Sequence, residues 1–117
     1  MTESDLLRQI MLALSERGHF VARANVGLFF TKDGRPVRTG LPPGFSDLFG
    51  HRAGDCRAFY LEVKTSTGRV RPEQVRFIEA MRQRGAIAAV VRSVEQAVGC
   101  VEDATDDAIP ASKPPTC

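Results

Sequence analysis

The sequence predicts a single small α/β domain, in which a mixed β-sheet is flanked by helices in the order αβββαβ and a short helix follows. Apolar residues recur at helical spacing near the N-terminus and again after residue 70, whereas the segments between them alternate as strands do. A nearly continuous apolar run follows the second helical pattern, as in a buried strand. A chain of 117 residues can bury one core but hardly two.

The first helix is expected over residues 3–17, where Thr2 or Ser4 can cap its start and Gly18 ends it. Its apolar positions at helical spacing are Leu6, Leu7, Ile10, Met11 and Leu14. The segment is therefore an amphipathic helix with one buried face.

A strand and a hairpin are predicted next. Residues 19–26 alternate between apolar and polar, and residues 28–39 hold two short apolar segments around a Lys-Asp-Gly-Arg turn. Residues 41–51 then pass from a loop rich in proline and glycine into a short strand. Residues 57–64 form a stronger strand, which we expect to pair with the short one.

The second helix is expected over residues 71–85, with Pro72 near its start and Gly85 at its end. Its inward side is expected to carry Val75, Ile78 and Met81, with Phe77 beside them. Residues 86–92 predict a strand buried on both faces, and residues 93–101 a short helix. The aromatic residues that we expect in the core, rather than as base-stacking platforms, are Phe29, Phe30, Phe59, Tyr60 and Phe77.

The domain is expected to span residues 1–101, because residues 102–117 have little to bury and form a disordered acidic tail with several prolines. No apolar run approaches the roughly 20 residues that cross a bilayer, and the N-terminus lacks the pattern of a signal peptide, so we expect a cytoplasmic protein. The 3 cysteines and 2 histidines are scattered, which argues against a disulfide framework or a zinc site. Any metal should therefore be held by oxygen.

The net charge of +2 conceals an asymmetry along the chain. Residues 1–92 carry 15 Lys and Arg against 9 Asp and Glu, whereas the remainder carries one Lys and five acids. Most of these cations are arginines, whose planar fork matches phosphate oxygens. A polyanionic partner fits this balance, but so does an ordinary solvated surface, so charge supports a nucleic-acid partner without establishing it.

Three residues at strand ends form the pattern that carries chemistry. Asp47 opens one predicted strand, while Glu62 and Lys64 close the next and share one face of it. If the two strands are neighbours, the three side chains meet at one place. Taken singly, an Asp in a turn is commonly a cap and a Glu-x-Lys pair is commonly an exposed ion pair, so the order and spacing carry the prediction.

Hydrolysis of a phosphodiester explains these residue types. A bare carboxylate would only repel the phosphate, but two carboxylates can hold Mg²⁺, which prefers oxygen ligands and acidifies a bound water. A lysine beside them can orient the attacking water or stabilise the charge that develops on phosphorus.

The strings PGFSDLFG, LEVKTSTGRVRPEQVRFI and RQRGAIAAVVRS resemble the VRR-NUC family of PD-(D/E)XK nucleases. The family's motifs appear in order: Gly-Phe-Ser-Asp ending at Asp47, Glu-Val-Lys beginning 15 residues later, then Gly68 and a helix bearing Gln74. The resemblance extends from Glu3 to about Arg92. Ser46 stands where the wider superfamily often has proline, although serine is common there within this family.

The resemblance implies a restriction-endonuclease-like core and a role for each matching residue. Asp47 and Glu62, joined by the carbonyl of Val63, would ligate the metal, and Glu3 matches an accessory acid that completes or backs this shell. Lys64 would be the catalytic lysine. Gln74 would steady that lysine or contact the scissile region. The residues expected on the DNA side are Asn25, Gly27, Ser46, Thr65 and Arg69.

The resemblance further implies a Mg²⁺-dependent endodeoxyribonuclease, with Mn²⁺ able to substitute. Stand-alone members of the family, many of them from phages or prophages, act on branched DNA such as four-way (Holliday) junctions. Because one site cuts one strand, symmetric cutting calls for a homodimer. Two alternatives stay open: a nuclease for flaps, nicked duplex or a specific sequence, and a DNA-binding module that has lost catalysis. The second is disfavoured because the expected acids and the lysine are all present.

Overall fold

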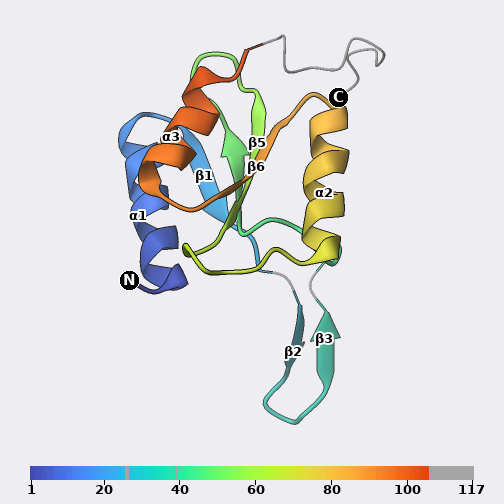
Figure 1. Cartoon of the computed structure of the whole chain (residues 1–117). Coiled ribbons are helices and arrows are strands. Elements are labelled where there is room, and N and C mark those ends of the chain that lie inside the picture. Colours follow the sequence, from blue (N-terminus) through green and yellow to red (C-terminus); the bar gives the residue numbers. More distant parts are fainter. Residues whose placement is uncertain (26, 39, 106–117) are drawn as a thin grey trace.

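The computed structural model describes residues 1–25, 27–38 and 40–105 and forms a mixed α/β domain (Figure 1). In chain order the elements are α1 (Glu3–Glu16), β1 (Phe20–Arg23), β2 (Leu28–Phe30), β3 (Pro36–Arg38), β4 (Leu48–His51), β5 (Ala58–Val63), α2 (Pro72–Gln83), β6 (Ile87–Val91) and α3 (Val94–Asp103). Apart from the β2–β3 hairpin, this is the predicted order αβββαβ followed by a short helix.

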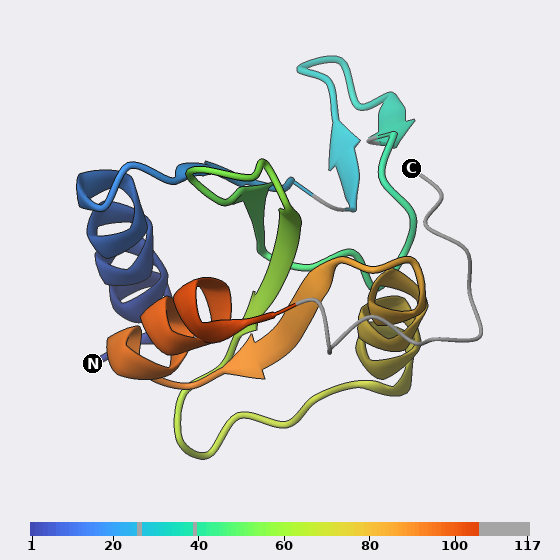
Figure 2. The same cartoon turned by 90° about the horizontal axis from the view of Figure 1, so that it is seen from above.

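The main sheet has four strands in the order β1-β4-β5-β6. The pairs β1–β4 and β4–β5 are antiparallel, whereas β5 and β6 are parallel and are connected through α2. Figure 2 shows three layers, with α1 and α3 on one face of the sheet and α2 on the other. The predicted pairing of residues 41–51 with residues 57–64 is confirmed by the β4–β5 ladder.

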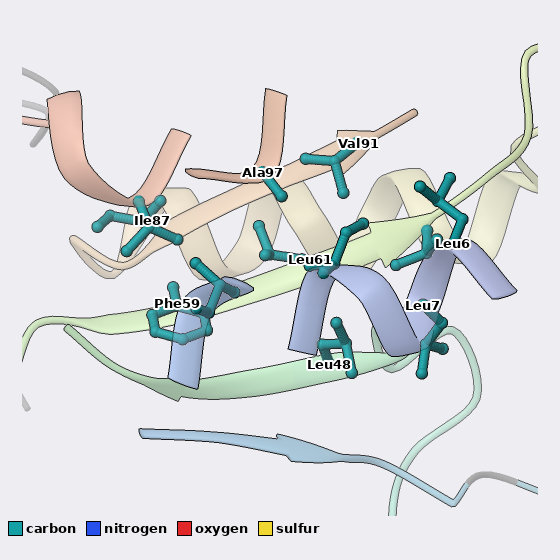
Figure 3. Packing of buried hydrophobic residues seen from close by; sticks show 12 residues of the cluster. Leu6, Leu7, Leu48, Phe59, Leu61, Ile87, Val91 and Ala97 are labelled. Carbon is teal, nitrogen blue, oxygen red and sulfur yellow. The ribbon is translucent and has the colours of Figure 1, made fainter. Parts of the chain in front are cut away.

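The larger core lies between the sheet and the helices α1 and α3. Figure 3 shows leucines of α1 facing Leu48 and Leu61 on the strands, with Val91 and Ala97 closing the other side. The helical spacing of apolar residues in α1 explains why that helix buries one face here. The buried members of this core are Leu6, Leu7, Ile10, Leu14, Leu48, Phe59, Leu61, Val63, Ile87, Val91, Ala97 and Val101.

An aromatic cluster fills the opposite face of the sheet, beneath α2. The ring of Phe45 lies 4.7 Å from that of Phe77 and 5.8 Å from that of Tyr60, measured between centroids. Phe49 completes the cluster at 5.7 Å from Phe45. Since Phe45 precedes Ser46 and Asp47, this packing holds the loop before β4 against α2.

Side-chain caps define where two of the helices begin. Thr2, rather than Ser4, caps α1: its hydroxyl accepts from the N–H of Asp5 at 3.1 Å, and the Asp5 carboxylate accepts from the N–H of Thr2 at 3.1 Å. Ser93 caps α3 by accepting from the N–H of Gln96 at 3.0 Å. Gly18, with φ of 89°, follows the end of α1 in the left-handed conformation that glycine tolerates.

Three expectations about burial were wrong. Phe29 and Phe30 are exposed, because β2 and β3 form a two-stranded sheet of their own. Val75 is also exposed, because Gln74 takes its place on the inward side of α2, where Ile78 is buried as predicted. The prediction for Phe59 is confirmed, and Tyr60 and Phe77 are partly buried in the aromatic cluster.

The C-terminal boundary of the domain lies beyond the predicted one. The last helix, α3, continues to Asp103, and Glu102 forms an ion pair with Arg17 at 3.1 Å and a hydrogen bond with His19 at 3.0 Å. Residues 102 and 103, which were predicted to begin the tail, therefore belong to the folded domain. Its remainder, residues 106–117, lies outside the described part of the chain. Within the described part, no helix is long and apolar enough to span a membrane.

Candidate active site

The chemistry-bearing residues meet where β4 begins and β5 ends. Asp47 directly precedes β4, Glu62 lies in β5, and Lys64 directly follows β5. In the β4–β5 ladder Leu48 is opposite Leu61, so Asp47 comes opposite Glu62 across the antiparallel pair. This register brings together acids that are 15 residues apart in the chain.

Asp47 is anchored through both its backbone and its side chain. The N–H of Val63 donates to Asp47 Oδ2 at 2.8 Å, and the N–H of Ala24 donates to the Asp47 carbonyl at 2.8 Å. The carboxylate thus takes the place of a ladder acceptor at the end of the strand pair. Its position is set by three strands, β1, β4 and β5.

Glu62 is buried, with 2% of its surface exposed. Its Oε1 accepts from Gln74 Nε2 at 2.9 Å and lies 3.8 Å from Lys64 Nζ. Its Oε2 is buried and, while both carboxyls are ionised, has no hydrogen-bond partner in the described part of the chain. Burying a carboxylate oxygen without a partner costs free energy of folding. A bound cation that is not part of the chain would offset this cost.

The pKa of Glu62 is raised, as expected for a carboxyl that is buried beside a second acid. Burial, followed by the hydrogen bond and the negative charge of Asp47, raises the pKa of Glu62 to about 8, and the charge of Glu3 adds to the rise. The ammonium of Lys64 acts in the opposite direction. Two ionised carboxylates cannot bond to each other, so Glu62 can share a hydrogen bond with Asp47 only after it takes up a proton.

Gln74 orients Glu62. Its Oε1 accepts from the N–H of Arg71 at 2.9 Å, which leaves its amide nitrogen to donate to Glu62. The amide therefore links the first turn of α2 to the buried acid. The sequence placed Gln74 at the lysine or the scissile region, whereas the structure places its side chain on Glu62.

Lys64 lies in a closely packed environment, with 7% of its surface exposed. Its backbone N–H donates to the Val91 carbonyl at 3.1 Å, which extends the pairing with β6. A Cβ added to Gly68 would lie 3.3 Å from Lys64 Cβ, so the loop after β5 passes close to the lysine. Arg92 fixes that loop by donating to the carbonyls of Thr65 at 2.6 Å and Gly68 at 2.9 Å.

A cleft of about 520 Å³ opens beside Asp47 and Gln74. Asn25 and Gly27, both expected on the DNA side, line it. The other lining residues are Arg23, Ala24, Phe29, Pro43, Gly44, Phe45, Arg71 and Glu73. Asp47 and Gln74 therefore face an open groove, whereas Glu62 and Lys64 do not line it. The wall of the groove carries two arginines and also Glu73, which lies 3.9 Å from Arg71.

Other expected site residues lie elsewhere. Ser46 is fully buried and its hydroxyl donates to the Leu48 carbonyl at 2.9 Å, so its side chain faces the protein interior rather than a substrate. Thr65 lines a second hollow next to Ser66 and Arg92, and Arg69 is exposed on the same loop. Glu3 is exposed at the start of α1 and acts on Glu62 through its charge.

Sequence reasoning missed three arginines near the site. Arg23 and Arg71 line the cleft, and Arg92 holds the loop after Lys64. Arg23 could have been found from its place at the end of the strand that precedes Asn25. Neither Arg71 nor Arg92 belongs to a recognisable pattern, because their roles depend on loops that approach only in the folded chain.

The donor atoms at this place suit a hard cation. Asp47 and Glu62 offer carboxylate oxygens, and the strand end adds backbone carbonyl groups. In the described part of the chain, no group of three or more His, Cys, Asp or Glu side chains could hold a metal ion. The acids here are a pair, so a bound ion would keep several water ligands, as Mg²⁺ does in proteins.

Comparisons with known proteins identify the family and agree with the fold. Residues 5–95 match the VRR-NUC domain family, a range that contains Asp47, Glu62, Lys64 and Gln74 but not Glu3. A solved structure titled "VRR_NUC domain" is similar at a TM-score of 0.60 and 24% identity, covering 86% of this chain and 94% of that chain. A search of curated proteins found no match.

Proposed function

Because the chain belongs to the VRR-NUC family of nuclease domains, we propose that it is a metal-dependent DNA endonuclease whose site comprises Asp47, Glu62 and Lys64. The observation that carries this proposal is the buried pair of carboxyls: when both are ionised, Glu62 Oε2 has no hydrogen-bond partner among the described residues, and the charge of Asp47 lies close to Glu62. A site that held only an ion pair would not leave this oxygen unsatisfied.

Mg²⁺ is the proposed cofactor, and Mn²⁺ is expected to substitute. Asp47, Glu62 and the carbonyl of Val63 would hold the ion, with Glu3 backing the site through its charge. When bound, such an ion lowers the pKa of a coordinated water and neutralises charge on the phosphate. Gln74 keeps Glu62 Oε1 in place through its hydrogen bond of 2.9 Å.

Lys64 is the proposed catalytic lysine. Its ammonium lies 3.8 Å from Glu62 and so belongs to the same group of charges. There it would orient the attacking water and donate to a phosphate oxygen as negative charge develops. The oxygen of water bonds to phosphorus, the ester bond to the leaving oxygen breaks, and that oxygen takes up a proton.

The proposed substrate is branched DNA such as a four-way junction, cut by a homodimer. The arginines Arg23 and Arg71 on the cleft wall support a phosphate backbone as the occupant. The branched form rests on the family resemblance, and the dimer rests on the symmetry of such a junction. Flaps, nicked duplex and sequence-specific duplex are the alternative substrates.

The test is a cleavage panel of labelled four-way junction, flap, nicked duplex, single strand and linear duplex, with Mg²⁺, Mn²⁺ or EDTA. The wild type should cut with either metal and not in EDTA. Lys64→Ala should abolish cutting and leave DNA binding largely intact, while Arg84→Ala, which removes an exposed cation at the far end of α2, should cut normally. Equal rates for Lys64→Ala and wild type would show that the site is assigned wrongly.

The same panel separates the remaining alternatives. A wild type that binds DNA but cuts none of these substrates with either metal would favour the DNA-binding module. Light scattering at micromolar concentration tests the homodimer, and a monomer would refute it.

A further inference from the structure

The β2–β3 arm, residues 28–38, has an apolar surface that folding of the domain does not explain. It forms a sheet separate from the main one and projects from the body of the domain (Figure 1). Its exposed fractions are 45% for Leu28, 51% for Phe29, 67% for Phe30 and 50% for Val37. Phe30 is thus the most exposed phenylalanine among the described residues.

The arm is a defined structure rather than a loose loop. Phe29 pairs with Val37 and Phe30 with Pro36 across the antiparallel strands. At the turn, the N–H of Thr31 donates to the Arg35 carbonyl at 2.8 Å, the N–H of Arg35 donates to the Thr31 hydroxyl at 3.0 Å, and that hydroxyl also donates to the Asp33 carboxylate. An ordered hairpin with large apolar side chains in water is the pattern of a binding surface.

The position of the arm relates it to the catalytic cleft. Phe29 lines that cleft together with Asp47 and Arg23. Phe30 is the next residue on the same strand and therefore points to the opposite face of the arm. The arm thus presents one ring to the cleft and one ring away from it.

The charges of the arm favour a polyanion. Lys32, Arg35 and Arg38 are exposed on it, and its one acid, Asp33, is paired with Arg35 at 3.0 Å. An aromatic surface that carries cations and continues into a cleft with arginines has the chemistry that binds unstacked nucleic-acid bases.

We propose that the β2–β3 arm binds DNA bases that have lost a stacking neighbour, with Phe29 and Phe30 as the stacking surfaces. This role of the arm rests on the proposed nuclease function and deepens it, because the arm would then discriminate between a branched substrate and a linear duplex. A continuous duplex offers the rings no free base face, whereas a branch point or a single-stranded segment does.

A second copy of the chain is the other candidate to bind this surface, but the exposed apolar area of the arm is small for a dimer interface. At about 200 Å² for a phenylalanine, the exposed parts of the four apolar residues sum to roughly 400 Å². A stable interface takes about 800 Å² from each partner. The apolar surface of the arm alone falls short of a stable dimer interface, whereas its area is that of a functional patch on a monomer.

The test is a DNA-binding titration of Phe29→Ala and Phe30→Ala, made in a Lys64→Ala background so that the DNA stays intact. The probes are a four-way junction, a duplex with a single-stranded flap, and a linear duplex. Phe20→Ala is the matched control, because Phe20 is an exposed phenylalanine on the main sheet rather than on the arm. Phe30→Trp adds a reporter, because the chain has no tryptophan.

Each arm substitution to alanine should weaken binding of the junction and the flap by about 5- to 150-fold, the range expected for loss of one stacked base. Linear duplex should bind as before. The slope of binding against salt should not change, because no charge is lost. The tryptophan of Phe30→Trp should be quenched by the flap and the junction but not by the linear duplex, at an affinity close to that of the unsubstituted arm.

Three results would overturn the proposal, and they are distinguishable. If the enzyme with Lys64 intact cuts DNA but the arm variants bind like the Phe20→Ala control and the tryptophan stays unquenched, the arm has no role in binding. If Phe29→Ala or Phe30→Ala converts a dimer to a monomer in light scattering, the surface belongs to a second copy. If the wild type neither binds nor cuts any probe, the nuclease function and the arm's role fail together. Circular dichroism of each variant confirms that it is folded.

Discussion

Replacing Glu62 with glutamine should stabilise the metal-free protein at neutral pH, although it removes an acid that we propose as a metal ligand. The buried carboxyl has a pKa of about 8 against an ordinary value of 4.5. Folding therefore favours the neutral form. The stabilisation that this gives is complete below the ordinary pKa, and it is lost as pH rises from there through the folded pKa.

The magnitude follows from the size of the shift. Each pH unit across that window costs up to about 1.4 kcal/mol of unfolding free energy, so the accumulated loss near pH 7 is roughly 3 kcal/mol. In Glu62→Gln the side-chain oxygen can still accept from Gln74 as Oε1 does now. The new amide group can donate to Asp47, in place of Oε2, which has no hydrogen-bond partner among the residues that the structure describes. We therefore expect Glu62→Gln to gain about 2 to 3 kcal/mol over wild type near pH 7, and little near pH 4.5.

The assay is urea unfolding in EDTA, followed by circular dichroism at several pH values between about 4.5 and 8. Glu79→Gln is the control, because it makes the same chemical change at an exposed position of α2. The stability difference between Glu62→Gln and wild type should grow with pH, and that of the control should stay flat. If Glu62→Gln is no more stable than wild type near pH 7, the pKa of Glu62 in the folded protein is not raised as the structure indicates.

Three further predictions concern the same site and its supports. Millimolar Mg²⁺ should raise the melting temperature of wild type near pH 8 but not that of Glu62→Gln, and equal shifts would place the ion elsewhere. Gln74→Ala should reduce Mg²⁺ affinity and cleavage by about 10- to 100-fold, because it removes the hydrogen bond that supports a proposed metal ligand. Gln83→Ala, at the end of α2, is the control for the metal titrations. An unchanged midpoint for Mg²⁺ activation in Gln74→Ala would refute that supporting role. Gly44→Ala should destabilise the fold by about 2 kcal/mol or more in urea unfolding, since φ is 84° and a Cβ would lie 2.3 Å from the Glu73 carbonyl oxygen. Wild-type stability for Gly44→Ala would mean that the loop before Asp47 does not approach α2 as described.

Local patterns were enough to predict most of the fold. The leucines of α1 recur at helical spacing, and the apolar residues of β5 end at Val63. Each pattern predicts one structure, because burial of one face leaves a period that can be read in the sequence. The encounter of Asp47 with Glu62 also followed from local reasoning, since strands joined by a short turn pair with each other. The predictions that failed depend on which elements pack together, and no local sequence pattern contains that information.

The hairpin and the second helix show this limit. The sequence of β2 indicates a strand, but alternation does not say whether another layer will cover it, and for Phe29 and Phe30 none does. In α2 a choice of the inward side by polarity selected Val75, yet the fold turns the neighbouring Gln74 inward to meet Glu62. A buried polar residue with a specific partner is invisible to a rule that ranks positions by hydropathy.

The position of Gln74 has a consequence for how the site could be observed. One amide group serves both the N–H of Arg71 at the start of α2 and the carboxylate of Glu62, so we expect fraying of that helix end to be coupled to the placement of the acid. Whatever steadies the acid should also protect the first turn of the helix from opening. Hydrogen–deuterium exchange at the amides there would then report on occupancy of the pocket without any substrate being turned over.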